Sequence, residues 1–100
     1  MNRNTQIKKN KNLSEICSIA SKLKTAEDIE SFLSELLTPS ELEDVTKRWE
    51  IFKMLHGKKP QRSIAKELSV SLCKVTRGAK IYKTGSSIIM QTLIDESWRR

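Results

Sequence analysis

The sequence has few of the residues from which catalytic and metal sites are built. Its 100 residues include two cysteines and one histidine. Cys17 and Cys73 lie far apart and form no metal-type pair, which favours a reduced setting over a disulfide framework. His56 stands alone, without paired acids, a nucleophile beside a base, or a phosphate-cradling loop. We therefore expect no enzyme, no metal site and no cofactor.

Long apolar runs are also absent. No stretch approaches the ~20 consecutive apolar residues that cross a bilayer, and the polar, basic N-terminus lacks the apolar core of a signal peptide. This pattern predicts a cytoplasmic protein without membrane contact. With 37% apolar residues, a chain of this length makes one small domain with a modest core, which dimerisation would enlarge.

Positive charge is concentrated in one stretch. Residues 58–83 carry eight Lys or Arg and one acid, Glu67, so their net charge of +7 equals that of the whole chain. Residues 27–50 carry eight acids against Lys47 and Arg48, a net charge of −6. This division predicts that the basic stretch faces a nucleic acid and that the acidic stretch faces away from it.

The basic stretch has the apolar spacing of two short packed helices. We predict one helix over Gln61 to Glu67 and a second from Leu72 to about Lys80, with apolar faces formed by Ile64, Ala65, Leu68, Val70, Leu72 and Val75. Ser71 can cap the second helix, and Ser69 occupies the turn position where a positive φ usually favours glycine. The pattern predicts a helix-turn-helix over residues 61–80.

Apolar spacing of this kind fits any pair of packed helices equally well. DNA binding is favoured by the polar groups that these helices would turn outward, because mixed amides, hydroxyls and Arg suit phosphates and base edges. They are Gln61, Arg62, Lys66, Lys74, Thr76, Arg77 and Lys80. A basic face that binds an acidic protein is the other interpretation.

Three further helices are predicted before this unit. One runs from Leu13 to near Lys24, and the next follows Thr25 as its N-cap. The third begins at Thr38-Pro39-Ser40-Glu41, where an N-cap, a Pro at the first helical position and a reciprocal Glu combine. It should end near Gly57, roughly 18 residues on.

The two ends of the chain differ in character. Residues 1–12 are basic and have too little apolar content to pack, so we predict a disordered tail and a single helical domain over residues 13–100. After a break at residues 84–87, a final amphipathic helix carries Ile88, Ile89, Leu93 and Trp98. We expect a partner subunit to cover its wide apolar face, the alternative being that it folds back on its own helices.

Four motifs together resemble the trp repressor family: Leu37-Thr38-Pro39, Arg48, Gln61-Arg62 and Val75-Thr76-Arg77-Gly78. The resemblance covers about Leu13 to Lys83. It implies an all-α, six-helix protein that forms an intertwined homodimer and represses genes of tryptophan biosynthesis or uptake. It also implies that L-tryptophan is the corepressor, which positions the helix-turn-helix units on palindromic double-stranded operator DNA.

The resemblance also implies roles for single residues. Arg48 and Arg77 would sandwich the indole and supply charge for the carboxylate, which suits the flat guanidinium. Ile51, Cys73 and Gly78 match positions lining the pocket, and backbone carbonyls of Glu35, Leu37 and Thr38 in the other subunit would receive the ammonium group. Positions expected to face DNA are Gln61, Arg62, Ala65, Leu72, Cys73, Lys74, Thr76, Lys80 and Lys83.

Some positions depart from the family pattern. Ile81 stands where the family has a Ser that helps to hold the ligand's amino group, and Ile cannot form that hydrogen bond. Lys74 replaces a small residue near the pocket and the phosphate backbone, and it would add a permanent charge contact. Lys80 replaces a common Asn, and the segment from Arg48 to Gln61 is one residue shorter than in the family. Ile81 and Lys74 support the alternative of a ligand-independent, or other-ligand, regulator of the same superfamily.

Overall fold

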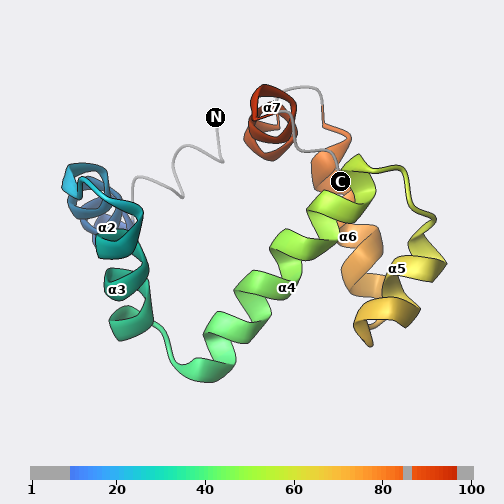
Figure 1. Ribbon diagram of the computed structural model, residues 1–100, viewed down its shortest axis with the longest axis horizontal. Helices are drawn as coiled ribbons and strands as arrows, with labels where there is room; N and C mark the ends of the chain where they lie inside the picture. Colours follow the sequence, from blue (N-terminus) through green and yellow to red (C-terminus); the bar gives the residue numbers. More distant parts are fainter. Residues whose placement is uncertain (1–9, 85–86, 97–100) are drawn as a thin grey trace. The chain divides into compact units, whose positions relative to one another are not determined.

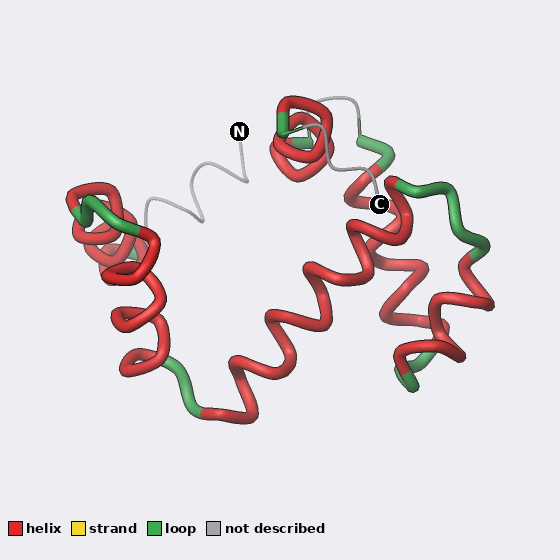
Figure 2. The backbone as a smooth tube through the Cα atoms, viewed as in Figure 1, coloured by secondary structure: helices red, strands yellow, loops and turns green. Residues whose placement is uncertain are grey.

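A computed structural model describes residues 10–84 and 87–96 of the chain. It contains six helices: α2 (Lys11–Lys22), α3 (Ala26–Leu36), α4 (Pro39–His56), α5 (Gln61–Leu68), α6 (Leu72–Tyr82) and α7 (Ile88–Asp95) (Figure 1). Figure 2 shows short loops between helices and no strand in this part of the chain, which confirms the all-α, six-helix prediction. None of these helices combines the length and the apolar character that crossing a bilayer requires.

Some sequence predictions fall outside the described residues. They concern residues 1–9 of the predicted tail, Gly85 and Ser86 of the predicted break, and Trp98 of the predicted last helix. The residues that the structure describes divide between Leu42 and Glu43 into two compact units, and each unit is described by itself.

In the first unit, α2 begins two residues earlier than its apolar spacing predicts. The Asn10 side chain accepts a hydrogen bond from the Leu13 N–H at 2.9 Å, and Lys11 and Asn12 are helical. A polar residue such as Asn can start a helix by capping it, although it contributes nothing to an apolar face. The predicted cap of α3 is confirmed, because the Thr25 hydroxyl accepts from the Asp28 N–H at 3.0 Å.

The apolar faces of α2 and α3 are largely uncovered. Neither helix contains a buried residue. Leu13, Ile19 and Leu36 are 45%, 47% and 46% exposed, respectively. The predicted amphipathic stripes therefore exist as helix faces, but these helices contribute no buried residue to a core within this chain.

Helix α4 begins at the predicted capping box. The Thr38 hydroxyl accepts from the Glu41 N–H at 3.1 Å, and the Glu41 carboxylate accepts from the Thr38 N–H at 2.8 Å. The helix ends at His56, as predicted near Gly57, but the left-handed residue beyond it is Lys58 (φ 65°) and not the glycine. Local capping chemistry thus determines both ends of this 18-residue helix.

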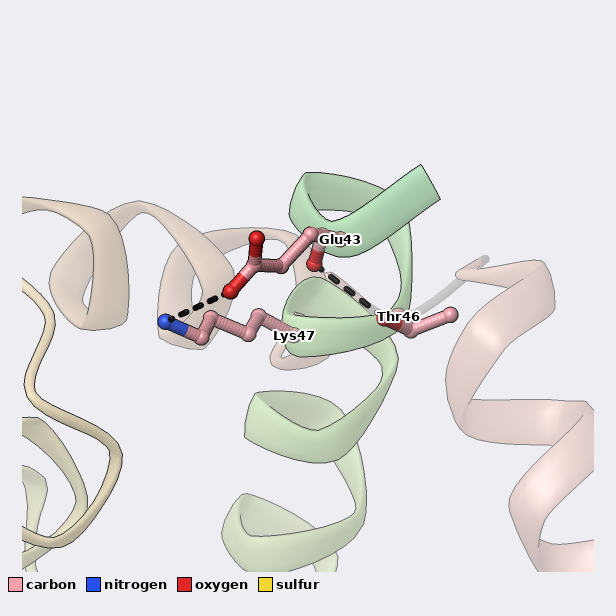
Figure 3. Close-up of polar contacts among 3 residues, drawn as sticks. All are labelled: Glu43, Thr46 and Lys47. Atoms are coloured by element: carbon pink, nitrogen blue, oxygen red, sulfur yellow. Dashed lines mark hydrogen bonds and ion pairs between the residues drawn. The ribbon is translucent and has the colours of Figure 1, made fainter. Parts of the chain in front are cut away.

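Two side-chain contacts on α4 join residues within one turn of the helix. Lys47 Nζ lies 3.7 Å from Glu43 Oε2, and the Thr46 hydroxyl donates to the Glu43 carbonyl oxygen at 3.1 Å (Figure 3). The ion pair joins residues four apart, with the acid on the N-terminal side, which is the favourable order on a helix. Exposed pairs of this kind add little to stability.

The core of the second unit lies where α4, α5 and α6 meet. Ile51, Ile64 and Val75 are 2%, 0% and 0% exposed, and five half-buried side chains pack against them: Met54, Leu55, Ala65, Leu68 and Val70. Leu72 was predicted to share this apolar face, but it is 41% exposed. Because side chains in a helix lean toward its N-terminus, the side chain of Leu72, the first residue of α6, extends beyond the part of α6 that packs in this core.

The turn between α5 and α6 has the predicted geometry. Ser69 is left-handed, with φ 56° and ψ 46°, and its N–H donates to the Lys66 carbonyl oxygen at 3.3 Å. Ser71 caps α6, since its hydroxyl accepts from the Lys74 N–H at 3.2 Å. The two helices, which lie side by side in Figure 1, are therefore joined by a tight, hydrogen-bonded connection.

We expect Ser69→Gly to stabilise the protein by about 0.5–1 kcal/mol, because glycine adopts the left-handed conformation without the steric cost that a Cβ imposes. Ser71→Ala is the matched control and should change stability in the opposite direction, because loss of the α6 cap should destabilise the protein by about 1 kcal/mol. Urea unfolding followed by circular dichroism measures both. A less stable Ser69→Gly variant would show that the turn residue is held by contacts other than its backbone conformation.

Helix α7 is covered only in part. Leu93 is fully buried, whereas Ile88 and Ile94 are 78% and 50% exposed. The burial of Leu93 agrees with folding back of α7 on the chain's own helices, while Ile88 and Ile94 leave apolar surface for a partner subunit.

His56 Nδ1 and the Tyr82 hydroxyl form a 2.7 Å hydrogen bond that joins the end of α4 to the end of α6.

Candidate functional site

An open pocket of about 80 Å³ lies between α4 and α6. Its lining comes from residues that share one face of each helix: Arg48, Ile51 and Phe52 on α4, and Lys74, Arg77, Gly78 and Ile81 on α6. Spacings of three and four residues place side chains on the same helical face, so the sequence positions of these residues account for their convergence once the two helices pack.

Gly78 allows the two helices to approach closely at the floor of the pocket. A Cβ added at Gly78 would lie 3.1 Å from Ile51 Cγ2, 3.7 Å from Leu55 Cδ1 and 3.8 Å from Phe52 Cε1. The first of these contacts is tighter than ordinary van der Waals packing, so a larger residue would push α6 away from α4. The absence of a side chain at this position therefore keeps the two walls of the pocket together.

The charged side chains of the pocket all carry the same sign. Arg48, Lys74 and Arg77 are exposed cations, and no acid is among the lining residues. The ion pairs in residues 10–84 and 87–96 involve other bases, namely Lys47, Lys53 and Lys59. Three cations without an ion-pair partner beside the apolar Ile51 and Phe52 make a site suited to an anion with an apolar body.

Five of the residues that the resemblance assigned to ligand binding meet in this pocket: Arg48, Ile51, Arg77, Gly78 and Ile81. Cys73 is exposed and is not part of the lining. Glu35, Leu37 and Thr38 lie in the first unit, at the end of α3 and the cap of α4, and their assigned role toward a partner's ligand stays a prediction.

Two lining residues were not assigned to the pocket in advance. Phe52 follows Arg48 by four residues on α4, a spacing that places both on one face and could have identified it. Lys74 was placed near the pocket but assigned to DNA; it precedes Gly78 by four residues on α6 and lines the pocket. The sequence shows which residues share a helical face, and the packing of α6 on α4 decides what that face meets.

Most residues expected to face DNA are exposed: Arg62, Leu72, Cys73, Lys74, Thr76, Lys80 and Lys83. Gln61 is half-buried, and its side-chain oxygen accepts a hydrogen bond from the Thr76 hydroxyl at 3.1 Å. Ala65 is also half-buried, and it packs against the core of the second unit. The bond between Gln61 and Thr76 ties the start of α5 to α6.

The fold and this site together define a small helical protein with an exposed, basic two-helix unit beside a cationic pocket. A family model described as "Trp repressor protein" matches residues 11–97. The chain therefore belongs to the Trp repressor family and is a trp-repressor-like regulator, which confirms the resemblance found in its motifs.

Individual relatives agree with the family assignment. The chain is 37% identical over 65 residues to a "Trp operon repressor homolog" of Xylella fastidiosa (strain M23), a match covering 64% of this chain and 71% of that protein. It is 33% identical over 67 residues to a protein of the same description from Chlamydia trachomatis serovar D, covering 66% of this chain and 71% of the relative. No solved structure matched the chain significantly.

Proposed function

We propose that this protein is a sequence-specific transcriptional repressor of genes for tryptophan biosynthesis or uptake. In this proposal it binds palindromic operator DNA as a homodimer, with L-tryptophan as corepressor. The observation that carries the proposal is the convergence of Arg48 and Arg77 on one pocket between α4 and α6. Their guanidinium planes suit stacking on an aromatic ring, and their N–H groups suit a carboxylate.

The DNA side of the proposal rests on α5 and α6. Residues 58–83 carry the net charge of +7, and their bases are exposed on the two helices and their flanks. Phosphate contacts from these bases would supply affinity, while Thr76 and the amide of Gln61 would contribute hydrogen bonds to phosphates or base edges. An acidic protein would need no such mixture of groups.

The homodimer in the proposal is supported by the uncovered apolar surface. Leu13, Ile19 and Leu36 are nearly half exposed on α2 and α3, and Ile88 is 78% exposed on α7. Apolar side chains in water are stabilised when a partner covers them. A twofold dimer would then present two reading units, and its operator would have two half-sites about one helical turn apart.

Ligand control follows from the position of the pocket. A ligand held between α4 and α6 would favour one orientation of the two-helix unit relative to α4. It can raise DNA affinity only by the difference between its affinities for the competent and incompetent orientations. The same coupling requires that DNA binding tighten the binding of ligand.

The direct test is fluorescence anisotropy of a labelled palindromic duplex from upstream of tryptophan genes, with and without millimolar L-tryptophan. We expect the ligand to tighten binding by about tenfold or more, which is ~1.4 kcal/mol of coupling. A scrambled duplex of the same length is the control and should show weak binding that falls steeply with salt. Loss of all preference between the two duplexes would contradict a role in operator recognition.

A second candidate is a regulator of the same superfamily that ignores tryptophan or answers another ligand. It is favoured by Lys74 and Ile81, both of which line the pocket. A fixed cation at position 74 would supply charge without a ligand, and Ile81 offers an amino group no hydrogen bond. Tight, sequence-specific binding that is unchanged by L-tryptophan in the same titration would favour this candidate.

A further inference from the structure

One hydrogen bond joins the side chains of two residues that were each expected to face DNA. The Thr76 hydroxyl, on the second turn of α6, donates to Oε1 of Gln61, the first residue of α5, at 3.1 Å. The two residues are 15 positions apart in the sequence, so the bond forms only because α5 packs against α6. The two polar side chains are therefore already linked in the protein without DNA.

This bond determines which polar groups the pair can still offer. A threonine hydroxyl has one proton, and a glutamine amide has one oxygen and two N–H donors. The Thr76 proton is engaged with the amide oxygen, whereas the N–H groups of Gln61 Nε2 have no protein partner within the described residues. The pair thus presents a donor at Gln61, and Thr76 has no proton left to donate to DNA.

The acidic side chain of the basic stretch is engaged elsewhere. Glu67 lies six residues beyond Gln61 on α5, and its Oε1 accepts from Lys59 Nζ at 3.0 Å. Residues 58–83 contain no other Asp or Glu. The acceptor for the Gln61 N–H groups is therefore expected on a negatively charged partner, which the surrounding bases attract.

We infer that Thr76 is a positioning residue for DNA binding and that it acts through Gln61. Its hydroxyl holds the Gln61 amide so that the NH₂ group donates to an acceptor atom of the DNA, which is a phosphate oxygen or an acceptor on a base edge. The inference rests on the DNA-binding role given to α5 and α6 under the proposed function. It adds that the two residues act as one unit and not as two separate contacts.

Holding the amide in place favours binding. A free glutamine side chain samples many rotamers, and fixing it at an interface opposes association. Gln61 is half-buried and its amide oxygen is already bound, so part of this ordering precedes the arrival of DNA. Loss of the Thr76 hydroxyl should therefore weaken DNA binding although the donor itself is still present.

The experiment is a double-mutant cycle on the full chain, read by anisotropy of the palindromic duplex at a fixed, millimolar concentration of L-tryptophan. Gln61→Met removes the amide and should weaken binding about fivefold, and Thr76→Val removes the hydroxyl and should weaken it about threefold. The double variant should bind within about twofold of Gln61→Met, because no amide is left to position. A double variant weakened by the product of the single effects, about fifteenfold, would overturn the inference.

The conservative variant Thr76→Ser separates positioning from a loss of structure. It keeps a hydroxyl that can donate to Gln61, so it should bind DNA within about twofold of the unsubstituted protein. Circular dichroism verifies that each variant is folded. Binding by Thr76→Ser as weak as that of Thr76→Val would overturn the inference, because the hydroxyl would then have no part in the effect.

A matched cycle uses Arg62→Met and Lys80→Met. These bases are exposed on the same two helices, and as donors only they cannot form a hydrogen bond with each other. Their effects on affinity should multiply. Coupling in this cycle as large as that between Gln61 and Thr76 would overturn the inference, because it would show a general loosening of the two helices.

The scrambled duplex separates this inference from the proposed function and identifies the acceptor. Equal coupling on both duplexes supports a phosphate oxygen, and coupling on the palindromic duplex alone supports a base edge. A protein that binds both duplexes equally and retains the coupling would contradict the sequence-specific repressor and leave the inference standing. A protein that prefers the palindromic duplex but shows multiplying effects at Gln61 and Thr76 would retain the repressor and overturn the inference.

Discussion

Arg77→Ala is expected to abolish the effect of ligand on operator binding. Arg77 lines the pocket together with Arg48 and Gly78, and it lies on α6, the helix expected to read DNA. The variant loses both the stacking plane and the donors for a carboxylate, so the ligand no longer distinguishes two orientations of the two-helix unit. The affinity ratio with and without ligand should fall from about tenfold to within about twofold, as measured by anisotropy.

Arg62→Ala is the matched control for this experiment. Arg62 is exposed on α5 and does not line the pocket. Its loss should weaken binding to DNA by a similar factor with and without ligand, because it removes an expected phosphate or base contact and leaves the pocket intact. A full ligand response in Arg77→Ala would refute the assignment of the pocket, whatever the behaviour of Arg62→Ala.

Ile64→Ala is expected to cost about 2–5 kcal/mol of unfolding free energy. Ile64 is 0% exposed and forms the core of the second unit with Ile51 and Val75. Truncation removes buried methyl groups and leaves a cavity that closely packed neighbours fill only in part. Since small domains are stable by only ~5–15 kcal/mol, urea unfolding should show a large shift of the midpoint.

The control for this prediction is Leu72→Ala. Leu72 begins α6 and is 41% exposed, so its truncation should cost less than about 1 kcal/mol. The comparison also tests the finding that Leu72 stands outside the core despite its apolar spacing. Equal destabilisation by the two substitutions would show that the α5–α6 unit does not depend on the buried cluster.

Helix ends were predictable where the capping group is itself a strong local signal. Thr38 and Glu41 bond each other's N–H groups as predicted, and Ser71 caps α6. The start of α2 was missed because Asn10 acts through a single hydrogen bond to Leu13 and leaves no trace in the apolar pattern. Prediction therefore succeeded where residues within one turn determine the geometry.

The candidate site was predictable in part. Arg48 and Arg77 were identified from motifs that resemble a family, and both line the pocket. Phe52 was missed, and Lys74 was placed near the pocket but assigned to DNA, because spacing along one helix does not reveal which other helix packs against it. Gly78 connects the sequence motif with the helix packing, because its lack of a side chain lets α6 approach α4.

The sequence by itself determined the helical class, most helix boundaries, the turn at Ser69 and the concentration of positive charge in residues 58–83. These features depend on backbone conformation, capping and charge, which act over a few residues. Only the tertiary structure decided that Leu72 is outside the core and that Lys74 joins Arg48 and Arg77 in one pocket. Those outcomes depend on the packing of α6 against α4, which brings together side chains more than twenty residues apart in the chain.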